Sequence, residues 1–484
     1  MAHHAEARLP EGATRRLGTR AWPLYRTGFV VGTAALLAAI GTAFAIEGWR
    51  FGFGDGWTAM AFRRFGLAYV VAFAFVLSLA LGALFFVLIQ HLTRAGASVL
   101  VRRVAEVYAA AMPTVATMFV PILAVVLLTS FGVLDRGVVY PWAQPMETLE
   151  AAGHAAHGEA AEPEAAPAGE HAGEPLGEEP FEGESTHTQI VGFTGAPDPA
   201  ELLHAVEVKR GWLNGPAFAL RWAVYFAVWC AAGLWYWQQS VRQDETGEPG
   251  LTVRMERLSP VAVLAFAVTL TFAAFDLLMS LDPKWYSTIF GVYYFSGAFL
   301  GAVSTMILSI VGLKRLGMLK VVDEDHLHDL GKWLFAFVFF WGYIAFSQYM
   351  LIWYANLPET TYWFDLRGMT TVPERITGWT GVALALLIGH LLIPFAGLLS
   401  RHVKRRGGLL ALWAAWLLVF HWLDLYWVVM PLYSRAWLVP IVEVLAVIGL
   451  AGLYFGAVVH RAADHSLVPA KDPRMGESLS FENV

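Results

Sequence analysis

Three strongly apolar stretches in the C-terminal part of the sequence are each interrupted by ionisable side chains, namely Glu443, Asp424, His421 and His390. Ionisable groups are costly inside a membrane and therefore mark candidate functional sites. If the stretches are membrane-spanning helices, a rise of about 1.5 Å per residue places Glu443 and Asp424 about 10 Å below one membrane face, His421 one turn deeper and His390 deeper again. Asp424 and His421 share a helix face, because residues three apart are neighbours. The pattern predicts a pathway for protons. The alternative is that each group only forms hydrogen bonds within a helix bundle.

A second pair of ionisable residues, Arg221 and Asp276, is predicted to lie roughly 8–10 Å inside one membrane face. A lone charge at that depth is expensive, so the two are expected to meet, either as a structural ion pair or at a bound polar head group. The chain turns shortly after Asp276, and aromatic rings with a few convergent polar groups suit a quinone. An interfacial turn has the same composition. The predicted head-group pocket consists of Arg221, Asp276, Asp282, Trp285 and Tyr286.

Long apolar helices must position these residues, and the sequence predicts an all-α polytopic membrane protein. The apolar runs reach the length of about 18 residues that is needed to cross a hydrocarbon core about 30 Å thick. Helices also satisfy their own backbone hydrogen bonds in lipid. About ten transmembrane helices are expected, at residues 24–46, 65–92, 112–134, 214–239, 258–281, 287–313, 333–356, 376–400, 409–431 and 437–460.

The composition excludes several classes of protein. The chain has 484 residues, of which 57% are hydrophobic and 15% charged, and its mean hydropathy is +0.53. Soluble domains carry about 25% charged residues, so soluble enzymes, secreted disulfide scaffolds and nucleic-acid-binding proteins are excluded. The single cysteine, Cys230, can neither form a disulfide within the chain nor hold an iron–sulfur cluster alone. No metal site is predicted, and any haem or iron–sulfur centre is expected in partner subunits.

The distribution of basic residues predicts the orientation. With a cytoplasmic N-terminus, the cytoplasmic segments hold 21 of the 33 Lys and Arg residues and the opposite segments hold 10, which follows the positive-inside rule. Residues 147–187, in the loop between the third and fourth helices, contain 11 glutamates and are expected to be largely disordered. The predicted division is a cytoplasmic tail at 1–23, three helices in 24–134, an acidic periplasmic insert at 135–213, seven helices in 214–460 and a cytoplasmic tail at 461–484.

Three strings resemble a known family. They are Phe275–Gly297 (FDLLMSLDPKWYSTIFGVYYFSG), Gln348–Thr361 (QYMLIWYANLPETT) and Lys209–Asn214 (KRGWLN). They are similar to the membrane subunits of alternative complex III, which belong to the NrfD-like, polysulfide-reductase-type family. The likeness is greatest to the second of the two large membrane subunits and covers most of residues 20–460. It implies two four-helix bundles, formed by helices 2–5 and 6–9, with helices 1 and 10 outside.

The resemblance also implies a function. The family contributes to respiratory complexes of the bacterial inner membrane that oxidise a quinol, either menaquinol or ubiquinol. Its partners are a sister NrfD-like subunit, an iron–sulfur protein, a c-type cytochrome and, in some assemblies, a terminal oxidase. We therefore expect a membrane subunit without a redox centre that offers a proton half-channel or a quinone pocket. Two alternatives remain open, a secondary transporter of a small solute and a purely structural membrane anchor.

Overall fold

The computed structural model describes residues 16–54, 56–134, 139–151, 199–369 and 376–483, and within them every regular element is a helix. Ten helical segments of this part of the chain are long and apolar enough to cross a membrane. The prediction of an all-α polytopic membrane protein is therefore confirmed. In chain order the segments are α1 (Ala21–Arg50), α2 (Trp57–Leu92), α3 (Val99–Ala110) with α4 (Met112–Ser130), α8 (Gly215–Thr246), α9 (Pro249–Leu277), α10 (Phe290–Arg315), α11 (Glu324–Ala355), α13 (Gly378–Ala385) with η5 (Leu386–Leu392) and α14 (Ile393–Leu398), α16 (Gly407–Val429), and α17 (Ile441–Ala462).

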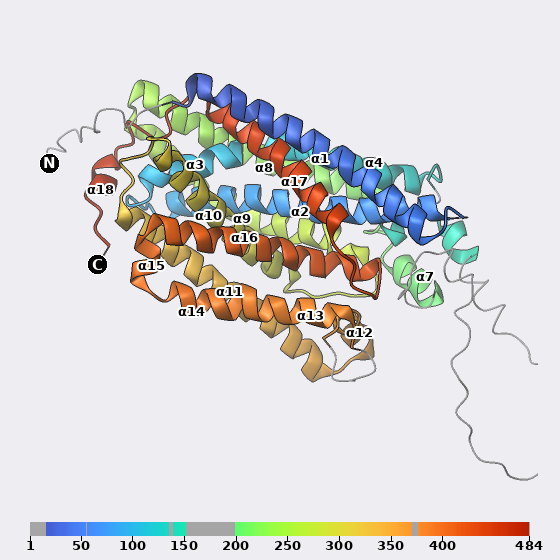
Figure 1. Ribbon diagram of the computed structural model, residues 1–484. Helices are drawn as coiled ribbons and strands as arrows, with labels where there is room; N and C mark the ends of the chain where they lie inside the picture. The colour runs from blue at the N-terminus through green and yellow to red at the C-terminus, as the bar shows by residue number, and fades with distance from the viewer. Residues whose placement is uncertain (1–15, 55, 135–138, 152–198, 370–375, 484) are drawn as a thin grey trace, which may run out of the picture.

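Two four-helix bundles make up the centre of the protein (Figure 1). The first consists of α2, α3–α4, α8 and α9, and the second consists of α10, α11, α13–α14 and α16. α2 packs against α10 and joins the bundles, and 94% of its most apolar part is buried. A helix that is apolar all round belongs in such a central position. α1 and α17 form a separate pair beside α2, so the arrangement of helices 2–5, 6–9, 1 and 10 is the expected one.

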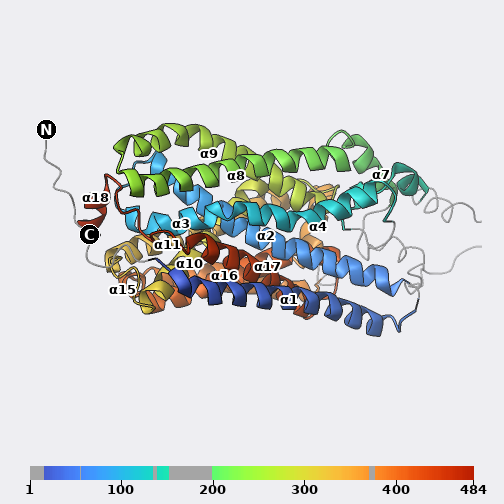
Figure 2. The same cartoon turned by 90° about the horizontal axis from the view of Figure 1, so that it is seen from above.

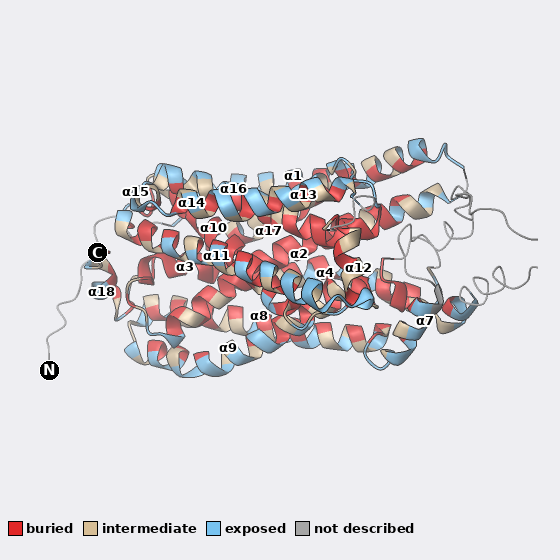
Figure 3. Cartoon of the chain, turned by 90° about the horizontal axis from the view of Figure 1, so that it is seen from below, coloured by how far each residue is buried: buried red, intermediate tan, exposed pale blue. Residues whose placement is uncertain are grey.

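The first and last described residues lie at one end of the molecule, which we call the terminal end, and the Gly18 amide donates to the Ala463 carbonyl there at 2.8 Å. The opposite end, which carries α7 (Pro199–Val208), is called the insert end. Seen from above, α8 and α9 lie on one side of α2 and α1 lies on the other (Figure 2). Buried residues follow the interior of both bundles, and exposed residues face outward (Figure 3). The predicted disorder of the acidic insert falls mainly on residues 152–198, which lie outside the described residues.

α1 and α17 approach each other closely because glycines line their contact. A Cβ atom on Gly28 would lie 2.8 Å from the carbonyl oxygen of Gly452, and one on Gly32 would lie 2.7 Å from that of Gly449. Small residues at helix interfaces allow this approach in membranes. The two helices therefore behave as one ridge on the side of the first bundle.

The third span begins 13 residues earlier than predicted, at Val99 instead of 112, and breaks between α3 and α4. Its first turns contain Arg102 and Arg103, whose charge lowers the hydropathy on which the prediction depends. Both are buried in ion pairs: Arg102 contacts Asp472 at 2.5 Å, and Arg103 contacts Asp244 at 2.7 Å. Asp472 belongs to the C-terminal segment, so the predicted cytoplasmic tail is packed onto the bundle there.

Candidate functional site

Asp424 lies buried near the insert end of α16 and is held by two uncharged donors. The hydroxyl of Tyr293 on α10 donates to Oδ1, and the indole Nε1 of Trp341 on α11 donates to Oδ2 at 3.2 Å. Only 2% of Asp424 is exposed, and no salt bridge reaches it from the described residues. Because neither donor is charged, the carboxyl group can gain or lose a proton without breaking an ion pair.

His421 lies one turn deeper on α16 and has a defined tautomer. The Ser78 hydroxyl on α2 donates to the Phe75 carbonyl at 2.6 Å, so its oxygen accepts from Nε2 of His421 at 2.8 Å. Nδ1 is left as an acceptor without a hydrogen-bond partner among the described residues. The ring fits against Gly297 and Gly301 of α10, where added Cβ atoms would lie 2.8 Å and 3.0 Å from it.

His390 lies in the π-helical segment η5, in the middle of the eighth span. Single π-helical turns are frequent at functional sites. The segment is stabilised by the Trp416 indole, which donates to the Gly389 carbonyl at 2.7 Å. His390 has no exposed surface, and neither ring nitrogen has a hydrogen-bond partner in the described part of the chain. Its ring lies 3.9 Å from the Trp341 ring, measured between centroids.

These residues form one group, which we call the histidine–aspartate cluster. Trp341 connects its two ends, because it donates to Asp424 and contacts the ring of His390. Three members were predicted, and three uncharged members were not, since such residues are common in apolar helices. A carboxyl group and two imidazoles are the side chains best suited to passing protons near neutral pH. The members are Asp424, His421, His390, Tyr293, Trp341 and Ser78.

Glu443, the fourth predicted member of the proton pathway, has different partners. Its Oε1 lies 3.5 Å from Nε of Arg64 on α2, and Nη1 of Arg64 lies 2.8 Å from Oε1 of Glu47 on α1. Among the described residues, no hydrogen bond or salt bridge joins Glu443 to Asp424. Arg64 was not singled out from the sequence, because it was counted among the loop residues before the predicted start of the second span. Its position seven residues inside α2 explains why it needs two carboxylates.

The predicted meeting of Arg221 and Asp276 is confirmed. Nε and Nη2 of Arg221 lie 2.8 Å and 2.9 Å from the two carboxylate oxygens. Asp276 also accepts from the Trp212 indole at 2.9 Å and from the Tyr225 hydroxyl at 3.0 Å. The guanidinium lies 4.1 Å from the Trp212 ring centroid. Two-point Arg–carboxylate contacts are strong and orient both groups, so this arrangement locks α8 to α9.

The other three residues of the predicted head-group pocket lie in the turn after α9 and are not equivalent. Asp282 is buried and accepts from the Tyr362 hydroxyl at 2.6 Å. Trp285 is buried and stacks on Trp363 with 4.2 Å between ring centroids. Tyr286 is 56% exposed. Burial raises the pKa of Asp282, whereas the hydrogen bond from Tyr362 opposes that shift.

Arg367, which the sequence analysis did not single out, links this turn to the second bundle. It follows α12 (Pro358–Leu366), its guanidinium carbon lies 3.4 Å from the Trp363 ring centroid, and it donates to the Val428 carbonyl on α16. Burial lowers the pKa of Arg367 to about 9, and the charge of Asp282 counteracts this. The guanidinium also acts electrostatically on Tyr293. Arg367 was not predicted as a site residue because a charged residue in a loop after a short helix is usually solvent-exposed.

Among the described residues, no group of three or more His, Cys, Asp or Glu side chains could hold a metal ion. No protein-family model matches the chain, and no curated protein shows significant similarity to it.

Proposed function

We propose that this chain is an integral membrane subunit of a respiratory, quinol-oxidising electron-transfer complex of the alternative complex III type, and that its histidine–aspartate cluster carries protons. The observation behind the proposal is Asp424, which is buried between two uncharged donors, one helical turn from His421 and linked through Trp341 to the ring of His390. A purely structural carboxylate at this depth is expected to have a cation. The other support is the resemblance of three sequence strings to that family.

The division of labour in the proposed complex follows from the residues present. The chain would contribute no redox centre, so electrons would pass through a partner iron–sulfur protein and c-type cytochrome, beside a sister NrfD-like subunit. The terminal end would face the cytoplasm of a bacterial cell, in agreement with the distribution of Lys and Arg. The insert end would face the periplasm.

A role in proton transfer has more support than quinone binding at the predicted head-group pocket. Arg221 and Asp276 satisfy each other, and the ring of Trp285 is covered by Trp363. These groups therefore have little capacity left for a ligand. The histidine–aspartate cluster has the opposite character, because Nδ1 of His421 and both nitrogens of His390 are without partners in the described residues.

The first experiment tests the assembly. The tagged chain is purified from its native membrane in a mild detergent, and the preparation is examined for haem by absorption and for iron–sulfur clusters by electron paramagnetic resonance. The proposal expects both kinds of centre to be purified with the chain. Isolation of the chain alone, with saturable binding of a small solute, would instead support a secondary transporter.

The second experiment tests the proton role with two matched variants of the purified complex in proteoliposomes. Asp424→Asn keeps the shape and the acceptor oxygen of the side chain but removes its proton chemistry. It is expected to slow proton movement coupled to quinol oxidation at least about tenfold, in line with the contribution of a positioned acid–base group. Asp276→Asn, measured at equal folded concentration, is the control. Normal proton movement in Asp424→Asn would leave a structural anchor as the function of the chain.

A further inference from the structure

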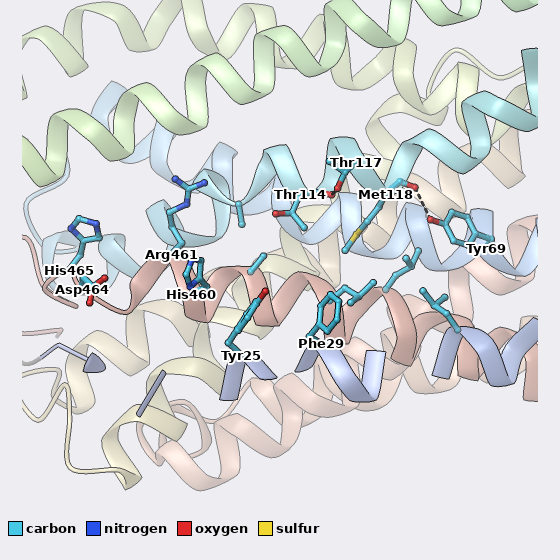
Figure 4. A pocket seen from close by; sticks show the side chains of 15 residues that line it. Tyr25, Phe29, Tyr69, Thr114, Thr117, Met118, His460, Arg461, Asp464 and His465 are labelled. Carbon is cyan, nitrogen blue, oxygen red and sulfur yellow. Dashed lines mark hydrogen bonds between the residues drawn. The ribbon is translucent and has the colours of Figure 1, made fainter. Parts of the chain in front are cut away.

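A groove with a volume of about 760 Å³ lies between α1, α4 and α17, and none of its lining residues belongs to the histidine–aspartate cluster (Figure 4). We call it the α1–α17 groove. Tyr69 of α2 lies at its inner part and donates to the Met118 carbonyl at 2.8 Å. The glycine-lined pair of α1 and α17 forms one wall of the groove, and α4 forms the opposite wall.

The lining of the groove changes from polar to apolar along its length. His460, Arg461, Asp464 and His465 lie at the terminal end, as Figure 4 shows. Towards the membrane centre the walls are mainly apolar and include Phe29, Leu36, Leu450 and Leu453, with the hydroxyl groups of Thr114 and Thr117 on the α4 side. This gradient matches an amphiphile with its head group at the terminal end and a hydrocarbon chain directed inward.

The length of the groove corresponds to one leaflet. The lining residues of α17 run from Leu450 to Arg461, and a helix of this length measures about 16 Å. Half of a hydrocarbon core about 30 Å thick is nearly the same distance. A lipid tail from one leaflet therefore fits along the groove, whereas a molecule that reaches across the midplane does not.

The charge at the polar end favours an anionic head group. The guanidinium of Arg461 forms no hydrogen bond or salt bridge with another described residue. Arg16 acts electrostatically on His465 at the same end, whereas the charge of Arg103 is compensated by Asp244, and Asp464 is the acidic member of the lining. Basic pockets between transmembrane helices recognise anionic lipid head groups, and a guanidinium is well shaped to bind phosphate.

We propose that the α1–α17 groove binds one anionic phospholipid from the leaflet at the terminal end, with its phosphate at Arg461 and His460 and one acyl chain along Phe29, Leu36 and Leu453. The lipid would fill the space between the α1–α17 ridge and the first bundle. It is a structural ligand, and its binding does not depend on the proposed function.

The test uses the full chain in its native complex, delipidated in detergent. The complex is titrated with phosphatidylglycerol or phosphatidylcholine. The unfolding temperature is measured, and bound lipid is counted by native mass spectrometry. The wild type is expected to retain one phosphatidylglycerol and to be stabilised by it more than by phosphatidylcholine. Arg461→Gln should weaken phosphatidylglycerol binding about tenfold, as expected for the loss of one charge-assisted contact.

Two further variants complete the test. Ala457→Phe fills the groove and should prevent retention of either lipid. Arg257→Gln on α9 removes an exposed charge at the same end and should bind phosphatidylglycerol like the wild type. Wild-type binding in both Arg461→Gln and Ala457→Phe would overturn the proposal. So would a bound quinone, instead of a phospholipid, that is released by Ala457→Phe.

Discussion

Asp276 in the first bundle and Asp424 in the second are two buried carboxyl groups with nearly the same donors. Each accepts from a tryptophan indole and a tyrosine hydroxyl, and each is at most 2% exposed. The difference is Arg221, which contacts both oxygens of Asp276 and has no counterpart at Asp424 among the described residues.

The presence of Arg221 therefore determines that two carboxyl groups with similar donors have different roles. Ion pairing fixes the charge of Asp276, because protonation would leave the partly buried Arg221 guanidinium without its carboxylate. Asp424 has only neutral hydrogen-bond partners, so gaining or losing its proton changes the strength of two hydrogen bonds and breaks no ion pair. Mutations that remove the cation, crowd the cluster or neutralise a carboxyl group can test this difference.

The largest loss of stability is expected for Arg221→Met. It leaves Asp276 buried without its cation, which should lower the free energy of unfolding by about 3 kcal/mol, a cost typical of breaking a buried pair from one side. Denaturant unfolding in detergent measures this change. The double variant Arg221→Met/Asp276→Leu should regain part of the loss, since no isolated charge remains. Equal stability of wild type and Arg221→Met would refute the ion-pair assignment.

A smaller loss is expected for Gly297→Ala, which crowds the histidine–aspartate cluster. The added Cβ would lie 2.8 Å from the His421 ring, so the ring or α10 must shift, at a cost of about 1–3 kcal/mol. Thermal unfolding gives the change. Gly312→Ala on the same helix is the control, because its Cβ would meet no other atom within 4 Å. The account fails here if the two variants unfold at the same temperature.

Asp424→Asn is expected to change the stability by only about 1 kcal/mol or less, because an amide oxygen can still accept one of the two donors. The loss of proton transfer described above should accompany a nearly normal unfolding curve. A loss of stability as large as that of Arg221→Met would show instead that Asp424 is charged and paired with a cation.

The smallest effect concerns Asp282, whose pKa is raised by burial. A carboxyl group with a higher pKa in the folded than in the unfolded chain binds its proton more tightly when folded. Stability should therefore fall as the pH rises from the ordinary carboxylate pKa towards the raised pKa of Asp282 in the folded protein. Asp282→Asn should flatten this slope, as followed by thermal unfolding across that range. An unchanged slope would mean that burial does not govern this group.

Hydropathy alone was sufficient to predict that the spans exist, though not where the third one begins, and equal depth was sufficient to predict the contact of Arg221 with Asp276. The same depth argument placed Asp424, His421 and His390 in one region, but it also included Glu443. Depth does not specify which neighbour a side chain faces, and Glu443 faces Arg64.

Other features could not be predicted because they depend on tertiary contacts. The start of α3 was missed since its arginines are neutralised by carboxylates distant in sequence, such as Asp244 and Asp472. The π-helical turn at His390 depends on Trp416, which belongs to another helix. Arg367 gains its partners only when α12 packs against α16.

The most direct test of the central claim is the pH-induced infrared difference spectrum of the purified protein in the region of the carboxyl C=O stretch. If Asp424 exchanges a proton and Asp276 does not, the wild type should show a carboxyl band that is absent in Asp424→Asn and unchanged in Asp276→Asn. Identical spectra of wild type and Asp424→Asn would contradict the claim that Asp424 is a proton carrier.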